Sequence, residues 1–189
     1  MAISALQSLE LIERLHAYDS VQPPAPEDEE SMRWVGTALS IAGVPLLVGE
    51  GELEEVIETP PCTPIPGTKP WVLGVAAFKG GLLPILSGDV LFRKRPYTGR
   101  TRDYCMVIRR PGIHFGITLS HVQRDQQFPI EERLMDHPVD PDFAEFALGG
   151  FKFEDRFMAV LDIDKLVADE ELANASAAQT SSFRGKNDE

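Results

Sequence analysis

The stretch WVLGVAAFKGGLLPIL, from Trp71 to Leu86, holds two apolar runs on either side of Lys79-Gly80-Gly81. Both runs are short and bounded by turn-forming residues, which is the pattern of β-strands, and adjacent glycines suit a tight hairpin turn. We therefore expect a β-hairpin with buried sides and one cation at its tip. The lysine is either a solvated turn residue or a contact residue.

Similar runs, each bounded by Gly, Pro or acidic clusters, recur from Arg33 to about Val167. The predicted strands are RWVGTALSI, VPLLVG, ELEEVIE, WVLGVAAF, GLLPIL, YCMVIRR, IHFGITLS, VQRDQQF, FALGGFKFE and RFMAVLDI. Further hairpin turns are expected at Ala42-Gly43, Pro111-Gly112 and Asp155-Arg156. A series of hairpins favours an all-β fold that closes, or nearly closes, into a barrel, because a barrel leaves few bare strand edges.

The chain also contains segments outside this β region. Residues 1–20 predict an amphipathic helix, because a Ser-x-x-Gln capping box precedes apolar residues at helical spacing, namely Leu6, Leu9, Ile12 and Leu15. Residues 21–32 form a proline-rich, acidic linker, residues 33–172 the β domain, and residues 173–189 a small, polar tail that we expect to be disordered. The helix either packs on its own domain or docks on a partner.

Composition excludes several classes of partner. The 189 residues carry a formal net charge of -12 with a pI near 4.8, which opposes binding to nucleic acids and to anionic membrane surfaces. No apolar run approaches the roughly 20 residues needed to span a bilayer, and residues 1–20 lack the features of a secretory signal, so we expect a cytoplasmic protein without direct membrane insertion. One stretch, residues 93–103, concentrates basic side chains and is either a solvated loop or a patch for an acidic partner.

No arrangement of residues predicts catalysis or a cofactor. Cys62 and Cys105 lack metal-site spacing and are expected to be reduced thiols. A hydrolase built on the adjacent Ser120 and His121 is a weak alternative, because neighbours in a strand point to opposite faces. The LDIDKL stretch could offer two carboxylates to a hard cation, but it more readily marks a strand that runs into a helix with Asp164 as its N-cap. The interpretation that remains is that the chain is a binding module without an active site.

The order of several motifs resembles the CheW family of chemotaxis coupling proteins. The motifs are PIPGTKPWVLGVAAFKGGLLPILSGDVLF, then YCMVIRRPGIHFGITLSHVQ, then FALGGFKFEDRFMAVLDIDKLVADEEL, and the resemblance covers about Arg33 to Leu172. It implies two intertwined five-stranded SH3-like β-barrels that share one hydrophobic core, with no catalysis and no cofactor. It also implies a scaffold that joins the cytoplasmic tip of a methyl-accepting chemoreceptor to the regulatory domain of a CheA-type histidine kinase, recruited from the cytoplasm to membrane-bound receptor arrays.

Within that family, the chain most resembles the adaptors of chemosensory systems that control type IV pili and twitching motility. The features that carry this resemblance are the acidic composition, the N-terminal helix and the W-V-L-G-V-A-x-F motif. The alternative is an interaction module with the same fold that uses its N-terminal helix to bind a different partner.

The resemblance also suggests contact residues. Receptor contacts are expected near Glu55, Phe78, Lys79 and Val122, and kinase contacts among Val75, Gly80, Leu83 and Ile85, some of which must belong to the core. The family carries Arg-Gly where this chain has Lys79-Gly80, and the cation is expected to bond to a carboxylate or to the receptor tip. Two aspartates common in the family are Ser87 and Ser120 here, which would remove charges able to pair with that cation.

Overall fold

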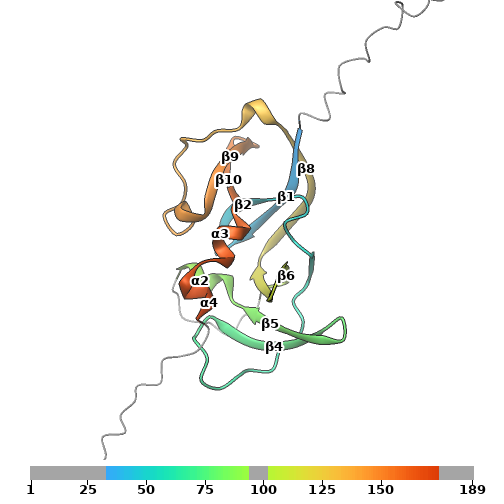
Figure 1. Ribbon diagram of the computed structural model, residues 1–189. Helices are drawn as coiled ribbons and strands as arrows, with labels where there is room; N and C mark the ends of the chain where they lie inside the picture. The colour runs from blue at the N-terminus through green and yellow to red at the C-terminus, as the bar shows by residue number, and fades with distance from the viewer. Residues whose placement is uncertain (1–32, 94–101, 175–189) are drawn as a thin grey trace, which may run out of the picture. The chain divides into compact units, whose positions relative to one another are not determined.

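The computed structural model describes residues 33–93 and 102–174 (Figure 1). The predicted N-terminal helix, the linker and all but the first two residues of the predicted tail lie outside these ranges. Within them, β-strands predominate, and three short α-helices accompany two 3-10 helices. The all-β prediction is therefore confirmed for the described domain.

The strands form two five-stranded sheets. The first sheet has the order β8 (His121–Pro129), β1 (Arg33–Ile41), β2 (Val44–Gly49), β10 (Arg156–Leu161) and β9 (Ala147–Phe153). The second has the order β3 (Glu55–Glu58), β6 (Tyr104–Arg110), β7 (Ile113–Leu119), β5 (Gly81–Leu86) and β4 (Val72–Phe78). The second sheet is thus inserted in sequence between the two parts of the first, as the resemblance implied.

The two sheets follow a similar plan. In the first, β2 and β10 run parallel, with Ala159 opposite Leu46; in the second, β5 and β7 run parallel, with Ile85 opposite Gly116. The other strand pairs with a described register are antiparallel. Each parallel pair needs a crossover. Four sequential strand pairs, β1–β2, β4–β5, β6–β7 and β9–β10, are hairpins, and the other connections join strands that are not neighbours in a sheet.

Strand alternation divides the apolar side chains among three cores. Leu46 and Val48 of β2 face the largest cluster, which also contains Met106 and Ile117 of the other sheet, whereas Leu47 faces a cluster confined to the first sheet. In the same way, Cys105 and Val107 of β6 flank Met106 but join a third cluster, with Ala76, Leu83 and Ile85. Successive side chains of a strand point to opposite faces. A strand that is buried on both faces therefore has a continuous run of apolar residues in its sequence.

The hairpin turns use residues with positive φ. Lys79 and Gly80 have φ values of 45° and 79°, and Ala42 and Gly43 have 53° and 83°, so both are two-residue turns of the primed kind that matches strand twist. The β9–β10 turn is centred on Glu154 and Asp155, one residue earlier than predicted. The strand predicted for residues 52–58 begins only at Glu55, because the preceding residues turn and the Glu52 amide bonds the Gly49 carbonyl at 3.2 Å.

Short helices connect or follow the strands. They are α2 (Gly88–Arg93), α3 (Ile163–Val167) and α4 (Glu170–Ala173), with the 3-10 helices η2 (Ile130–Glu132) and η3 (Ala144–Phe146). The predicted N-cap at Asp164 was wrong. Asp162 caps α3, accepting a hydrogen bond from the Lys165 amide at 2.9 Å, whereas Asp164 lies in the first turn and pairs with Arg110. None of the helices in the described ranges is long and apolar enough to cross a membrane.

A proline-rich loop, residues 59–71, protects the outer edge of the second sheet. Its Thr63 exchanges two backbone hydrogen bonds, of 2.8 and 3.0 Å, with Val75 of the edge strand β4. Gly74 makes this approach possible, since its φ is 146° and an added Cβ would lie 2.2 Å from the Thr63 carbonyl oxygen. Pairing the edge in this way removes a site for unwanted strand addition.

Candidate functional site

The cation at the hairpin tip contacts two carboxylates. Lys79 Nζ lies 3.0 Å from Glu54 Oε1 and 2.6 Å from Glu55 Oε1. Glu55 is the first residue of the edge strand β3, and Glu54 directly precedes that strand, 25 residues before the lysine. These contacts, first with Glu55 and then with Glu54, raise the pKa of Lys79. The expectation that the tip cation bonds to a carboxylate is therefore confirmed.

Glu54 is the centre of a larger cluster. Arg109 of β6 donates from Nε to Glu54 Oε2 at 2.7 Å, and His114 Nε2 of β7 lies 3.0 Å from the same oxygen. The backbone amide of Glu54 also bonds the Val107 carbonyl at 2.8 Å, which fixes the acid against β6. The hydrogen bonds from Arg109 and then Lys79 lower the pKa of Glu54 from 4.5 to about 2, so this carboxylate is charged at any physiological pH.

An aromatic side chain completes the tip. The Lys79 ammonium lies 5.0 Å from the centroid of the Phe78 ring, within cation–π range, and that ring lies 5.8 Å from the His114 imidazole. Phe78 is half-buried and packs against the core of the second sheet. The tip is thus held from β3, β4, β6 and β7, and three of the predicted receptor contacts, Glu55, Phe78 and Lys79, lie together.

The fourth predicted receptor contact, Val122, belongs to β8 and lies beside the later residues of β3. Val122 of β8 lines a surface hollow with Val56, Glu58 and Tyr104. Next to it, Arg124 of β8 donates a 2.8 Å hydrogen bond to the Val56 carbonyl of β3, so the edge strands of the two sheets meet here. A second hollow is also lined by Arg124 and extends to Glu54 and Glu55. Val122 and the lysine tip therefore lie near opposite ends of β3.

The predicted kinase contacts separate into core and surface. The side chains of Leu83 and Ile85 are 0% exposed and belong to the core of the second sheet, so the expectation that they contact a partner does not fit the structure. The reason is strand alternation, which turns both toward the interior. Val75 is half-buried and Gly80 is exposed. Leu82, which was not among the predicted contacts, has a side chain that points outward and is 73% exposed.

The two serines that replace family aspartates lie far from the tip. Ser87 follows β5, six residues of strand or roughly 20 Å from the turn at Lys79-Gly80, and its hydroxyl accepts a bond from the Val90 amide in α2. Ser120 follows the parallel neighbour β7 and donates to the Ser40 carbonyl at 3.2 Å. The idea that these positions would pair with the tip cation was wrong, since they lie at the other end of the sheet. The Ser120 hydroxyl also has no base among its described partners.

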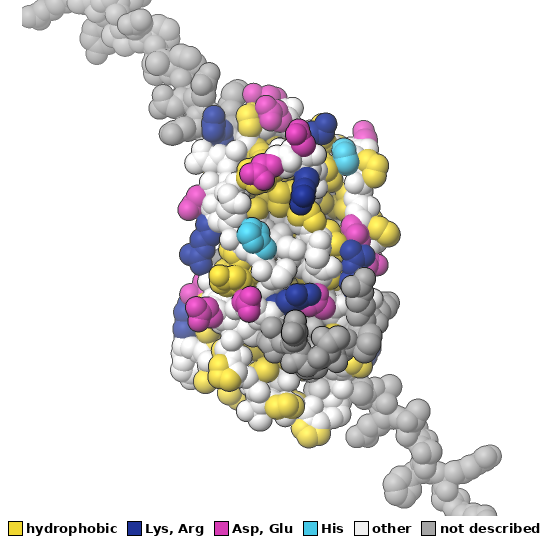
Figure 2. All heavy atoms as spheres, turned by 180° about the vertical axis from the view of Figure 1, so that it is seen from behind, with side chains coloured by type: hydrophobic (Ala, Val, Ile, Leu, Met, Phe, Trp, Pro, Cys, Tyr) yellow, Lys and Arg dark blue, Asp and Glu magenta, His cyan; other side chains and the backbone are white. Residues whose placement is uncertain are grey.

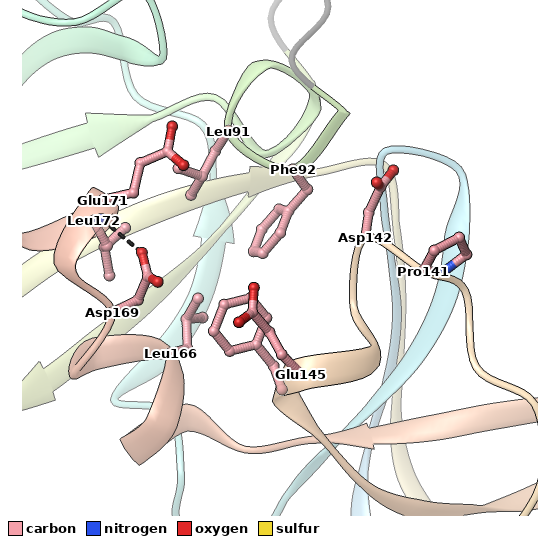
Figure 3. A pocket seen from close by; sticks show the side chains of 10 residues that line it. Leu91, Phe92, Pro141, Asp142, Glu145, Leu166, Asp169, Glu171 and Leu172 are labelled. Atoms are coloured by element: carbon pink, nitrogen blue, oxygen red, sulfur yellow. Dashed lines mark hydrogen bonds between the residues drawn. The ribbon is translucent and has the colours of Figure 1, made fainter.

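A separate hollow lies where the short helices meet. Figure 3 shows Leu91 and Phe92 of α2 facing Leu166 and Leu172, with carboxylates such as Glu145 around the rim. Two of these rim acids have local structural roles, because Asp169 caps α4 and Asp142 pairs with Arg93 at 2.7 Å. Arg93 and Arg102 are the described ends of the predicted basic stretch, and Arg102 pairs with Asp89 at 2.6 Å. Both arginines are therefore engaged within the domain.

Comparison with known proteins decides the family. The model of the CheW-like domain matches residues 40–171, which is more than half of the chain. The chain belongs to the CheW-like domain family. Members of this family are non-catalytic scaffold adaptors, in agreement with the sequence analysis.

Two individual proteins are similar to this chain. The chain is 31% identical over 107 residues to Protein PilI of Pseudomonas aeruginosa, a match that covers 56% of this chain and 60% of PilI. It also superimposes on the crystal structure of the scaffolding protein TtCheW from Thermoanaerobacter tengcongensis, with a TM-score of 0.57 and 18% identity, over 69% of this chain and 89% of TtCheW. The second likeness confirms the predicted CheW-like fold.

Three residues of the tip cluster were missed by the sequence analysis, namely Glu54, Arg109 and His114. The spacing of Arg109 and His114 around the Pro111-Gly112 turn could have placed them opposite each other, as their pairing in β6 and β7 shows. No signal in the sequence joined them to Glu54, which is 55 residues before Arg109. Long-range pairing of strands decides that contact.

Proposed function

We propose that this chain is an adaptor that couples a methyl-accepting chemoreceptor to a CheA-type histidine kinase, within a chemosensory system that controls type IV pili and twitching motility. The match of a CheW-like domain over residues 40–171 carries this proposal, and the identity with PilI supports the finer assignment. The adaptor acts from the cytoplasm and reaches the membrane only through the receptor.

The receptor contacts the lysine tip and the adjoining edge of β3. Lys79, Glu55 and Phe78 form one end of this surface, and Val122 lies near the other end. The surface combines ionic groups with a half-buried aromatic ring and shallow hollows. Such a mixture suits the side of a receptor helix pair, where apolar and charged residues alternate.

The kinase contacts the outward face of the β4–β5 hairpin. Val75, Gly80 and Leu82 provide this surface, while Leu83 and Ile85 support it from beneath as core residues. Leu82 is 73% exposed, so a partner that covers it buries apolar surface. This burial stabilises the complex by roughly 25 cal/mol for each Å² of apolar surface removed from water. An apolar hairpin face of this kind is a suitable anchor for the regulatory domain of the kinase.

Simultaneous binding explains the adaptor role without catalysis. Each partner raises the local concentration of the other when both are held on one rigid domain, which can strengthen association by roughly 10² to 10⁴ without any new contact. Control of kinase activity requires, in addition, that the complex favour one kinase state over another.

A titration with two partners tests this function. The full chain is titrated with the regulatory domain of a CheA-type kinase, and separately with a cytoplasmic receptor fragment, both from the same cell, and each titration is repeated without residues 1–30. Micromolar or tighter binding to both, retained after truncation, is the expected result. The variant Leu82→Asp should lose kinase binding and keep receptor binding, and Met135→Asp, at another exposed apolar position, should lose neither. Absence of binding to either partner would refute the coupling function, and loss of binding on truncation would favour a helix-mediated contact instead.

A further inference from the structure

The tip cluster has a layered arrangement of charge. The Lys79 and Arg109 side chains are 54% and 57% exposed, whereas those of Glu54 and Glu55 are 17% and 34% exposed. The cations thus form the outer layer and the acids the inner one. An approaching group meets positive charge first, although the protein as a whole carries a net charge of -12.

The two exposed cations are close neighbours. Lys79 Nζ lies 3.0 Å and Arg109 Nη2 lies 3.5 Å from the same oxygen, Glu54 Oε1. Because both nitrogens lie next to the same oxygen atom, the distance between them is short. The two oxygens of a single incoming carboxylate can therefore contact both nitrogens. The carboxylate of Glu54 thus holds Lys79 and Arg109 close to each other.

Both cations retain hydrogen-bonding capacity. An ammonium has three N–H donors and a guanidinium has five. Arg109 directs Nε and one Nη2 contact to Glu54, and Nη2 also lies 3.4 Å from His114. Among the described residues, nothing bonds to its Nη1 group, whose two donors remain for a ligand.

We propose that Arg109 is a second receptor-contacting cation, which together with Lys79 binds one acidic side chain of the receptor, and that Glu54 is the positioning residue that fixes both. This inference rests on the proposed function and specifies its chemistry. A planar guanidinium can hold one carboxylate through two nitrogens and still donate from the third, which an ammonium cannot do. Arg109 contacts Glu54 through Nε and Nη2, and its Nη1 donors supply the second cationic contact beside Lys79.

Figure 2 shows acidic and basic side chains side by side over the face of the molecule opposite to that in Figure 1. Because the charges there are mixed, recognition of a carboxylate depends on a local arrangement of cations rather than on net charge. Ionic contacts between partly exposed groups are screened by salt, with a Debye length of roughly 8 Å at physiological ionic strength. Binding through this pair should therefore weaken as salt is added.

The test measures the affinity of the full chain for a purified cytoplasmic fragment of a methyl-accepting chemoreceptor. Arg109→Gln is expected to weaken binding roughly tenfold, as the loss of one charge-assisted contact implies, and to reduce the salt dependence. Arg109→Lys should recover only part of the affinity, because an ammonium keeps the charge but cannot hold Glu54 through two nitrogens while a third donates to the receptor. The matched control Arg156→Gln changes an exposed arginine at the β9–β10 turn and should leave affinity unchanged.

The role of Glu54 is tested by a double-mutant cycle. Lys79→Gln and Arg109→Gln should be non-additive in receptor affinity when Glu54 is present and closer to additive in a Glu54→Gln background, while Glu54→Asp keeps part of the coupling. A urea unfolding curve for each variant shows whether the fold is intact. Wild-type binding with an Arg109→Gln affinity equal to that of Arg156→Gln would overturn this inference alone. Absence of wild-type binding would overturn the proposed function together with it.

Discussion

Two neighbouring leucines in β5 should respond in opposite ways to truncation. Leu83 is 0% exposed and packs with Ala76, Ile85, Cys105 and Val107, whereas Leu82 is 73% exposed. Leu83→Ala removes a fully buried side chain and leaves a cavity, which costs about 2–5 kcal/mol of folding free energy. Leu82→Ala removes a side chain that folding scarcely buries, so its effect should stay within about 0.5 kcal/mol.

Urea unfolding followed by tryptophan fluorescence measures this difference. Trp71 is 4% exposed and belongs to the shared core, so its emission should shift when the domain unfolds. For a domain of this size a loss of 3 kcal/mol corresponds to a fall in Tm of about 10 °C. Kinase affinity should follow the reverse order, with Leu82→Ala weakening binding and Leu83→Ala changing it only through the folded fraction. Equal stability of the two variants, or a larger loss for Leu82→Ala, would refute the assignment of core and contact face.

Three further predictions concern charge, thiol reactivity and capping. The pKa of Glu54 is lowered to about 2, so its contribution to stability is complete above about pH 4.5 and disappears as the pH falls toward 2; the difference in urea midpoint between wild type and Glu54→Gln should shrink over that interval, and a constant difference would contradict the pairing. Burial raises the pKa of Cys105 to about 12, so a thiol reagent at neutral pH should modify Cys62 in the native protein and Cys105 only after denaturation, whereas rapid labelling of both native thiols would argue against a buried Cys105. Asp162→Ala removes the cap of α3 and should cost about 1 kcal/mol, more than the same change at the exposed Asp164, and the reverse order in thermal unfolding would favour the original assignment of the cap.

Much of the secondary structure could be predicted because its signals are local. The strands β1, β2, β5 and β6 have the predicted bounds, since each apolar run ends at a Gly-containing turn, a change of pattern or a helix start. Errors occurred where a local rule allowed two answers. Two aspartates, Asp162 and Asp164, could each cap α3, and only the observed φ and ψ angles distinguish them.

The candidate site was less predictable. The positions of Lys79 and Gly80 followed from turn chemistry, because both must adopt positive φ in a two-residue hairpin. The partner of the cation did not follow, and Ser87 and Ser120 were wrongly associated with it. Their distance from the tip depends on the lengths and directions of β5 and β7, which a list of motifs does not contain.

The sequence by itself determined an all-β chain of hairpins, a lysine at one exposed tip and membership of an adaptor family, because alternation, turn residues and motif order are properties of neighbouring residues. Only the tertiary structure decided which apolar residues face the shared core, which belong to one sheet and which, like Leu82, face outward. It also decided that Glu54 meets Lys79 and Arg109, residues 25 and 55 positions away. The physical reason is that these contacts depend on the pairing of strands distant in sequence, and a pairing register is fixed by the packing of the whole domain.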